Sequence, residues 1–494
     1  MDYLDGLSLV DGPVLWLVWA SAAAGLAYLL WHVALRHTGL ARTGLAHAGR
    51  REPGAAVAVA ATVTLLAAAL VAAVHWFLLY AVTVFPAELP GETLAWSVAG
   101  VLALLLWLMR LLGLWGRGRT GTISTGTDST GTDSTGTDST GTSPTGAAPT
   151  GAAPSRRHRW RSSAAATAAF LAVLALSAVQ INIYFGLNHT VGDLTGAAAA
   201  RIQPLEAGLT RAAGAPAATG LAHWQAPAHL PDGVIRKAVI PGTVSGFQSR
   251  DAYVYLPPAY LGSPRPALPV LVLFSGQPGG PADWLTGGAL RSRLDRFAAE
   301  HAGVAPVTVV VDPNGSASGN TLCMDSRIAR ADTFLARDVP DWIKRTLDVD
   351  PDPRQWAAGG FSFGGTCAMQ MVTRHPDVYS AALAFSSEEE PALAKVRAKT
   401  IEASFGADAA AFDQLTPLRV MAEHRFDGHG VYFAAGDRDP QFTGHMDALS
   451  EAARRAGFSV ETHRIANAGH SWDVASGGLP GGLDFLARRW GIEQ

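Results

Sequence analysis

The pentapeptide Gly360-Phe361-Ser362-Phe363-Gly364 carries the hydroxyl of this chain best placed for nucleophilic chemistry. It follows the apolar run QWAAGG and precedes a helical stretch, TCAMQMVTRH. A sharp turn between a strand and a helix lifts a serine hydroxyl out of a sheet, and the small neighbours let strand and helix approach closely. The N-terminus of the helix also favours developing negative charge. The pattern predicts Ser362 as a nucleophile that attacks a carbonyl carbon.

A serine of this kind needs an acid and a histidine, which should follow it in that order. Two carboxylates compete for the acid after the strand-like run GVYFAA, namely Asp437 and Asp439. We favour Asp439, and the other would pair with Arg438 or cap the next helix. His470 lies in a glycine-containing loop after the last strand-like run, SVETHRIA, and is predicted to act as general base and then general acid.

The glycine-rich loop after the strand-like run PVLVLFS is the candidate oxyanion hole. In hydrolases with this order of elements, the loop at this point donates one backbone N–H to the oxyanion. Gln277 is the best donor because Pro278 has no N–H. Phe363, the residue after the serine, would supply the second donor, whereas Gly279 and Gly280 fit an ordinary turn equally well.

The sequence offers no pattern for a metal or a cofactor. Two cysteines are too few for a zinc site of four thiolates, and no His/Asp cluster has ligand spacing. A net charge of −3 gives no global attraction for nucleic acid. The other histidines that we considered are expected to be structural or at the surface: His424, His429, His445 and His463.

The residues that must position this site belong to a region of alternating strands and helices that starts at about residue 236. Because apolar strands alternate with helical stretches, we expect a mostly parallel sheet with helices on both faces. The helical candidates are 330–346, 363–375, 442–456 and 479–490. The strand-like runs are RKAVIP, AYVYLP, PVLVLFS, PVTVVVD, QWAAGGF, YSAALAFS, GVYFAA and SVETHRIA.

The first 190 residues are much more apolar than this region. The whole chain of 494 residues is 48% hydrophobic and 16% charged, whereas soluble domains carry about 25% charged residues. Four apolar runs, at 14–35, 56–85, 94–115 and 164–187, reach the roughly 20 residues that a helix needs to cross a bilayer. The first run is too long for a signal peptide, and acidic residues precede it.

The arginines predict the orientation of these four helices. Arginines cluster between the first two runs and again between the third and fourth, whereas the loop between the second and third holds only Glu88 and Glu92. By the positive-inside rule, the chain is a multi-pass cell-membrane protein with its N-terminus and everything after residue 188 outside the cytoplasm.

These patterns divide the chain into five parts. Residues 1–115 are expected to form three transmembrane helices, and 116–163 a disordered cytoplasmic linker built on a TGTDS repeat. A fourth transmembrane helix at 164–187 leads into an extracytoplasmic stalk at 188–235. The catalytic domain occupies 236–494.

Residues 236–494 resemble the putative-esterase family of α/β-hydrolases, which includes esterase D-type enzymes and the antigen 85 mycolyltransferases. The resemblance implies an α/β-hydrolase fold and a Ser362–Asp439–His470 triad that acts on carboxylic esters. The acid is an aspartate, as in the plain esterases, whereas the mycolyltransferases have a glutamate. The four helices make the chain similar to membrane-anchored esterases of actinobacteria. The matching motifs are YLPPAY, GQPGG, DVPDWI, GGFSFGGTCA, RHPDVYSAALAFS and GHSWD.

Cys323 and Cys367 are the two cysteines of the chain. An extracytoplasmic domain with two cysteines favours one disulfide, which would tether the loop of Cys323 beside the nucleophile. Closing about 44 residues would stabilise the fold by roughly 3–4 kcal/mol. The alternative is a pair of free buried thiols.

Three further side chains are candidates for substrate binding. In one interpretation, Glu388 and Asp325 bind a cationic or polyhydroxyl group of the substrate. In the other, Glu388 to Glu390 form the solvated start of a helix. Trp472 follows the loop of His470.

We therefore predict a membrane-anchored serine esterase whose substrate is a lipid or another envelope ester. The alternatives are an acyltransferase, an aminoacyl-phospholipid hydrolase, and an inactive membrane sensor.

Overall fold

The structure is a computed structural model that describes residues 2–37, 54–82, 86–112, 156–211, 219–227 and 229–492. These residues form two compact units. The first comprises Met1–Trp16, Ala72–Leu94 and Ala178–Gln494, and the second Leu17–Val71 and Ala95–Ser177. Most of the predicted TGTDS linker lies outside the described residues.

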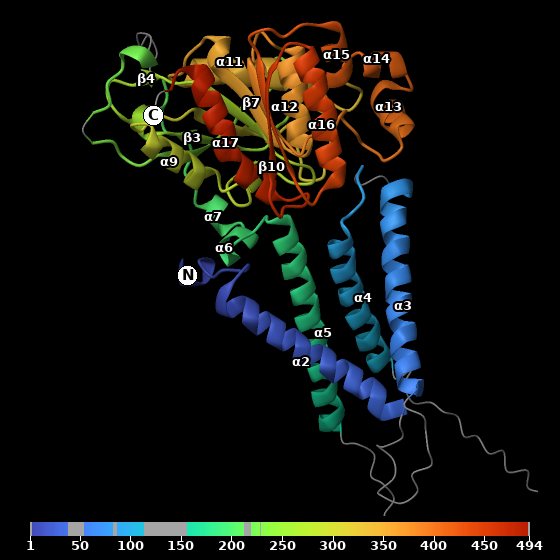
Figure 1. Cartoon of the computed structure of the whole chain (residues 1–494). Coiled ribbons are helices and arrows are strands. Elements are labelled where there is room, and N and C mark those ends of the chain that lie inside the picture. Colours follow the sequence, from blue (N-terminus) through green and yellow to red (C-terminus); the bar gives the residue numbers. More distant parts are fainter. Residues whose placement is uncertain are drawn as a thin grey trace, which may run out of the picture. The chain divides into compact units, whose positions relative to one another are not determined.

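Four long helices occupy the predicted apolar runs (Figure 1). They are α2 (Gly12–His37), α3 (Gly54–Trp76), α4 (Gly91–Leu111) and α5 (Arg156–Phe185), and the turn η1 (Phe77–Ala81) continues α3. Each contains a stretch of 20 to 25 residues that is long and apolar enough to cross a membrane. Helix α5 begins at Arg156, inside the region predicted as linker, so the fourth helix starts earlier than expected.

Small residues allow close helix packing within the second unit. A Cβ atom on Gly25 would lie 2.8 Å from the carbonyl oxygen of Ala169, so α2 and α5 approach closely there. Large apolar side chains point away from this packing, for example Leu65, which is 71% exposed. Small residues between helices and exposed leucines outside are typical of a bundle that lies in lipid.

The first unit contains an eight-stranded, mostly parallel sheet, with the strand order β10-β9-β8-β7-β5-β6-β3-β2. All neighbours from β10 to β6 pair in parallel, and β3 and β2 add an antiparallel edge. All eight predicted strands are present. They are β2 (Val234–Ala238), β3 (Ala252–Leu256), β5 (Val270–Phe274), β6 (Val307–Val311), β7 (Trp356–Phe361), β8 (Ala381–Phe385), β9 (Gly430–Gly436) and β10 (Ser459–Ile465).

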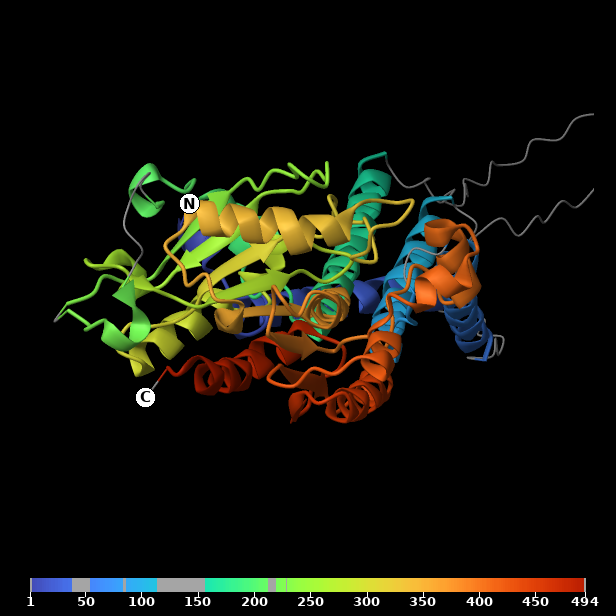
Figure 2. The same cartoon turned by 90° about the horizontal axis from the view of Figure 1, so that it is seen from above.

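Helices cover both faces of this sheet, as predicted. Helices α9 (Leu290–Glu300) and α17 (Trp472–Trp490) pack against each other on one face, and α11 (Val339–Thr346) lies on the other (Figure 2). Helix α12 (Phe363–Arg374) follows β7 directly and packs against β7 and β8. Strand β3 and strands β5 to β9 are fully buried, which explains their continuous apolar sequences, whereas the edge strands β2 and β10 are partly exposed.

Helix α17 starts seven residues before the predicted boundary at 479. The sequence disfavours a helix there, because glycines and Pro480 are weak helix formers. Tertiary packing provides the compensation, since a Cβ on Gly478 would lie 2.9 Å from the ring of Phe385. The missing side chain lets the helix lie close to the sheet.

Several short elements were not predicted. Helices α13 (Arg397–Phe405), α14 (Ala409–Asp413) and α15 (Pro417–Glu423) lie between β8 and β9. The expected stalk contains α6 (Val191–Leu194) and α7 (Ala197–Ala200), and its strand β1 (Thr219–Gly220) pairs with β4 (Pro266–Ala267). These elements are too short to show a clear periodicity.

Candidate active site

Ser362 occupies a strained turn between β7 and α12. Its backbone has φ 56° and ψ −119°, an unusual conformation for a residue with a side chain. Two glycines make the turn possible. A Cβ on Gly360 would lie 2.2 Å from the backbone of Gly364, and a Cβ on Gly364 would lie 2.3 Å from the carbonyl oxygen of Phe274. The turn therefore presents the serine hydroxyl at the carboxyl end of the sheet.

His470 lies next to Ser362 in the structure, although the two residues are 108 positions apart in the sequence. Its Nε2 lies 2.8 Å from the Oγ of Ser362. The imidazole is stacked between two rings, with centroids 4.0 Å from Phe442 and 5.2 Å from Phe361. This stacking restricts the ring to an orientation in which Nε2 faces the serine.

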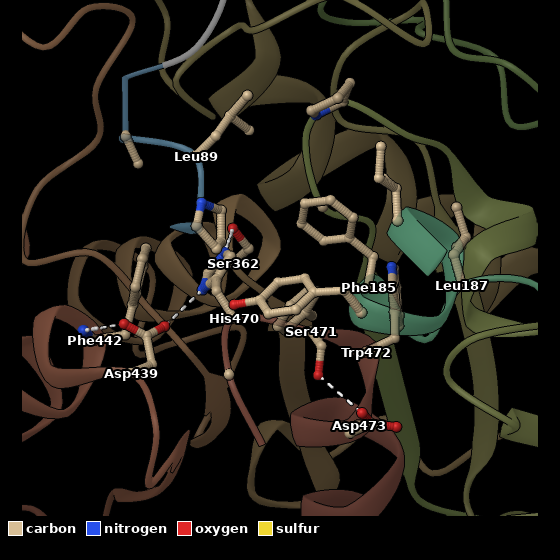
Figure 3. Close-up of a pocket in the computed structure, with 18 of the residues that line it drawn as sticks. Leu89, Phe185, Leu187, Ser362, Asp439, Phe442, His470, Ser471, Trp472 and Asp473 are labelled. Atoms are coloured by element: carbon tan, nitrogen blue, oxygen red, sulfur yellow. Dashed lines mark hydrogen bonds and ion pairs between the residues drawn. The ribbon is translucent and has the colours of Figure 1, made fainter. Parts of the chain in front are cut away.

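Asp439 lies on the other side of the imidazole. Its Oδ2 is 3.3 Å from the Nδ1 of His470. Its Oδ1 accepts a hydrogen bond from the backbone N–H of Phe442 at 3.3 Å, so Asp439 also caps α16 (Pro440–Arg455). Asp437 is exposed and does not line the pocket, so of the two candidate acids it is Asp439 that faces the histidine (Figure 3).

The two predicted oxyanion donors both line the pocket with the serine. Phe363 is the first residue of α12, so its backbone N–H belongs to the unpaired first turn of the helix. Gln277 follows Gly276, whose added Cβ would lie 3.9 Å from the Cβ of Ser362.

An ion pair between a half-buried arginine and a buried aspartate, which no sequence motif marks, supports this loop. The guanidinium of Arg250 donates to Asp312 from Nε at 2.7 Å and from Nη2 at 2.9 Å. The same Nη2 donates to the carbonyl oxygen of Gly279 at 2.9 Å. Arg250 thus holds the loop of Gln277 at the end of the sheet.

Of the three candidates for substrate binding, Glu388 and Trp472 line the pocket and Asp325 does not. Burial in the pocket wall raises the pKa of Glu388 to about 8. The Asp325 carboxylate instead accepts the backbone N–H of Thr333 at 2.9 Å. Trp472 packs edge-on against Trp284 at 5.4 Å.

Cys323 and Cys367 are joined by a disulfide. Cys367 lies in α12, one turn beyond the serine, and Cys323 lies in the loop after β6. Both residues are fully buried. The bond ties this loop to the helix that carries the elbow. Among the described residues, no group of three His, Cys, Asp or Glu side chains could hold a metal ion.

The pocket is larger than the sequence motifs suggest, with a volume of about 1000 Å³. Part of its wall comes from two segments far away in sequence, residues 86–92 and 181–188. Figure 3 shows Leu89 above Ser362, and Phe185 and Leu187 to the right of it. No local motif marks these residues, because they reach the site only through the three-dimensional fold.

Residues 247–478 match the model of the family described as Putative esterase. We refer to this segment as the esterase domain, after the family whose model it matches. The esterase domain contains Ser362, Asp439 and His470. Both of the distant wall segments lie outside it.

A protein of Corynebacterium glutamicum, whose name is given as uncharacterized, is 39% identical over 257 residues. That alignment covers 51% of this chain and about 60% of the length of the relative. Similar solved structures include a ferulic acid esterase, with 22% identity, a TM-score of 0.43, and coverage of 52% of this chain and 99% of that one. An S-formylglutathione hydrolase from Agrobacterium tumefaciens has 17% identity, a TM-score of 0.42, and coverage of 52% and 95%.

Proposed function

We propose that this protein is a membrane-anchored serine esterase that hydrolyses carboxylic esters of lipids or other envelope components. The observation that carries the proposal is the distance of 2.8 Å between Ser362 Oγ and His470 Nε2 at a strained strand-to-helix turn. A nucleophile, a base and an orienting acid in this arrangement are what acyl transfer through a serine requires.

In the proposed reaction, His470 takes the proton of the Ser362 hydroxyl while the oxygen attacks the ester carbonyl. The backbone N–H groups of Gln277 and Phe363 stabilise the resulting oxyanion. Collapse of the tetrahedral intermediate breaks the bond to the alcohol, which leaves with the proton from His470. Water then attacks the acyl-enzyme with His470 as base, and the carboxylic acid leaves. Asp439 orients the imidazole and stabilises its charged form.

The membrane part of the proposal rests on four helices of sufficient length and apolarity and on the arginine distribution. We propose that these helices cross the cell membrane with the N-terminus and the esterase domain outside. A catalytic domain held at the membrane meets lipids and other envelope esters at high effective concentration.

The test is an ester-hydrolysis assay on the full-length protein in lipid nanodiscs. Wild type should cleave p-nitrophenyl acetate, and Ser362→Ala should lose at least about a thousandfold in kcat/KM. The matched control is Ser459→Ala, at an exposed serine outside the pocket, which should keep the wild-type rate. Full activity in Ser362→Ala would refute the proposal. Product analysis with a sugar acceptor would separate hydrolysis from acyl transfer.

One observation favours a second candidate, hydrolysis of an aminoacyl ester. Glu388 lines the pocket, where its carboxylate could pair with the ammonium group of an aminoacyl substrate. This candidate predicts that Glu388→Gln loses more activity on lysyl esters than on acetyl esters. Equal losses on both would remove it.

A further inference from the structure

Several apolar side chains that line the pocket come from outside the esterase domain, and four of them carry the following argument. They are Leu89, Ile181, Phe185 and Leu187, and we call them the apolar wall. All four are half-buried and belong to the same compact unit as Ser362. We propose that the apolar wall binds the hydrocarbon chain of a lipid-like ester whose carbonyl lies at Ser362. This inference rests on the proposed esterase function.

The first argument is that the wall does not serve the protein core. Among the described residues, Leu89, Ile181 and Phe185 belong to none of the buried apolar clusters, and only Leu187 packs against one. Their side chains instead face a cavity. Apolar area that faces water gains about 25 cal/mol for each Å² that a ligand covers. A hydrocarbon chain is the ligand that gains most from such a wall.

The second argument is that the wall is held in place. The segment of Leu89 is tied to the esterase domain by an ion pair between Glu88 and Lys395 at 3.3 Å. The turn after α5 is closed by Asn182, whose amide donates to the carbonyl oxygen of Asn188 at 2.6 Å and accepts the backbone N–H of Asn188 at 3.0 Å. A preformed wall lowers the ordering cost of binding a chain.

Contact with the catalytic loop also fixes the end of α5. A Cβ on Gly469 would lie 2.5 Å from the hydroxyl oxygen of Tyr184, so the phenol rests on the backbone next to His470. Phe185 is the neighbour of this tyrosine, with ring centroids 5.2 Å apart. The position of the wall is therefore coupled directly to that of the catalytic histidine loop.

The third argument is size. A volume of about 1000 Å³ lies at the upper end of the range for ligand pockets, roughly 300–1000 Å³. An acetyl group would fill only a small part of this space. Leu89 lies above Ser362 in Figure 3, and Phe185 and Leu187 lie to its right, so a long chain attached to the carbonyl has apolar surface to cover within the pocket.

The test compares long and short esters in the full-length protein in nanodiscs. One series varies the acyl chain, from p-nitrophenyl acetate to decanoate, and the other varies the alkyl chain, from methyl to decyl acetate. The variants are Leu89→Asn and Phe185→Ala. The matched control is Ile328→Asn, which changes an aliphatic residue that is 43% exposed and outside the pocket.

We expect the long-to-short ratio of kcat/KM to fall at least tenfold in both variants, in one of the two series. Each methylene group that leaves water raises kcat/KM about fourfold. A variant that loses contact with two methylene groups therefore loses more than tenfold. The series that responds identifies the chain as acyl or alkyl. The ratio should stay within twofold of wild type in Ile328→Asn, because partition of the ester into the lipid is the same for wild type and for every variant.

The inference would be overturned if Leu89→Asn and Phe185→Ala still cleave esters and have the same long-to-short ratio of kcat/KM as the Ile328→Asn control in both series. Fluorophosphonate labelling of Ser362 in each variant reports that the site is folded. If labelling is lost in Leu89→Asn, Leu89→Trp replaces it, and its narrower pocket should shift the preference to shorter chains. An unshifted preference there would also overturn the inference. Absence of both labelling and hydrolysis in wild type would instead refute the proposed function.

Discussion

At the scale of single residues, the site depends on how His470 is held. Phe361 and Phe442 stack on the two faces of the imidazole, and Asp439 faces its Nδ1 edge. The ring has little freedom to turn away from the serine. We therefore propose that Asp439 orients the imidazole and stabilises its charged form, and that it does not accept the proton.

This arrangement predicts different effects for the two neighbouring aspartates. Asp439→Asn should reduce kcat about 10³- to 10⁴-fold, because the amide no longer stabilises the imidazolium or its tautomer. Asp437→Asn, its matched control at an exposed position two residues away, should stay within about threefold of wild type. Steady-state kinetics on p-nitrophenyl acetate measure both. A large loss in Asp437→Asn alone would assign the acid to Asp437.

The raised pKa of Glu388 predicts an effect of pH on stability. With a pKa of about 8 in the folded state, against an ordinary value near 4.5, the folded protein binds more protons than the unfolded chain between these two pH values. The free energy of unfolding therefore falls as pH rises from about 4.5 to 8, and levels off above. Glu388→Gln stays neutral and should lose this component of the decline.

The measurement for Glu388 is denaturant unfolding of wild type and Glu388→Gln at pH 5 and pH 8. The variant should gain about 1–2 kcal/mol relative to wild type between these pH values, a figure reduced for the partial exposure of the side chain. A difference that does not change with pH would show that Glu388 ionises normally in the folded protein.

At the scale of elements, the contact between β7 and α12 determines where the serine lies. The strand and the helix meet backbone to backbone at Gly360 and Gly364, with no room for a methyl group. The disulfide of Cys367 attaches the same helix to the loop after β6. The position of the nucleophile is thus a property of two packed elements and not of one residue.

A pair of Gly→Ala changes tests this packing. Gly360→Ala should destabilise the protein by about 3 kcal/mol or more, because the new methyl group would overlap the backbone of Gly364. Gly444→Ala, at an exposed position of α16 with no atom within 4 Å of the added Cβ, should stabilise by about 0.5–1 kcal/mol. Chemical denaturation of both variants checks the opposite signs. Equal stability of Gly360→Ala and wild type would contradict the close approach.

The same elements show what could be read from the sequence. Each central strand of the sheet is buried on both faces, so its continuous apolar run marks it clearly, and the elbow of Ser362 has a strong local pattern. The start of α17 could not be predicted, because packing against Phe385 overrides the poor helix propensity of its glycines. The choice between Asp437 and Asp439 needed the spatial position of His470.

At the scale of the whole molecule, the active-site pocket combines parts of the chain that the sequence keeps apart. Residues 86–92 include the start of α4, and residues 181–188 include the end of α5, yet both segments line the same cavity as Ser362. The sequence predicts these helices well from their length and apolarity. It does not indicate that the ends of these helices contribute to a binding site, because no periodicity or motif predicts a contact between segments that are hundreds of residues apart in the sequence.

Cysteine labelling tests the proposed orientation in the membrane. Both native cysteines are bonded to each other, so they should not react with a maleimide. In intact cells, a membrane-impermeant maleimide should label Ser459→Cys, in the esterase domain. It should label Ser129→Cys, in the TGTDS repeat, only after the cells are permeabilised. The reverse pattern would place the esterase domain in the cytoplasm.

The central claim is that Ser362 is an activated nucleophile, and fluorophosphonate labelling with peptide mass spectrometry tests it most directly. The full-length protein should acquire one adduct, on Ser362, at a rate that falls at least about a hundredfold in His470→Ala because the base is gone. The adduct should also be absent from Ser362→Ala. An unlabelled Ser362 in the folded wild-type protein, or an adduct at another serine, would contradict the account.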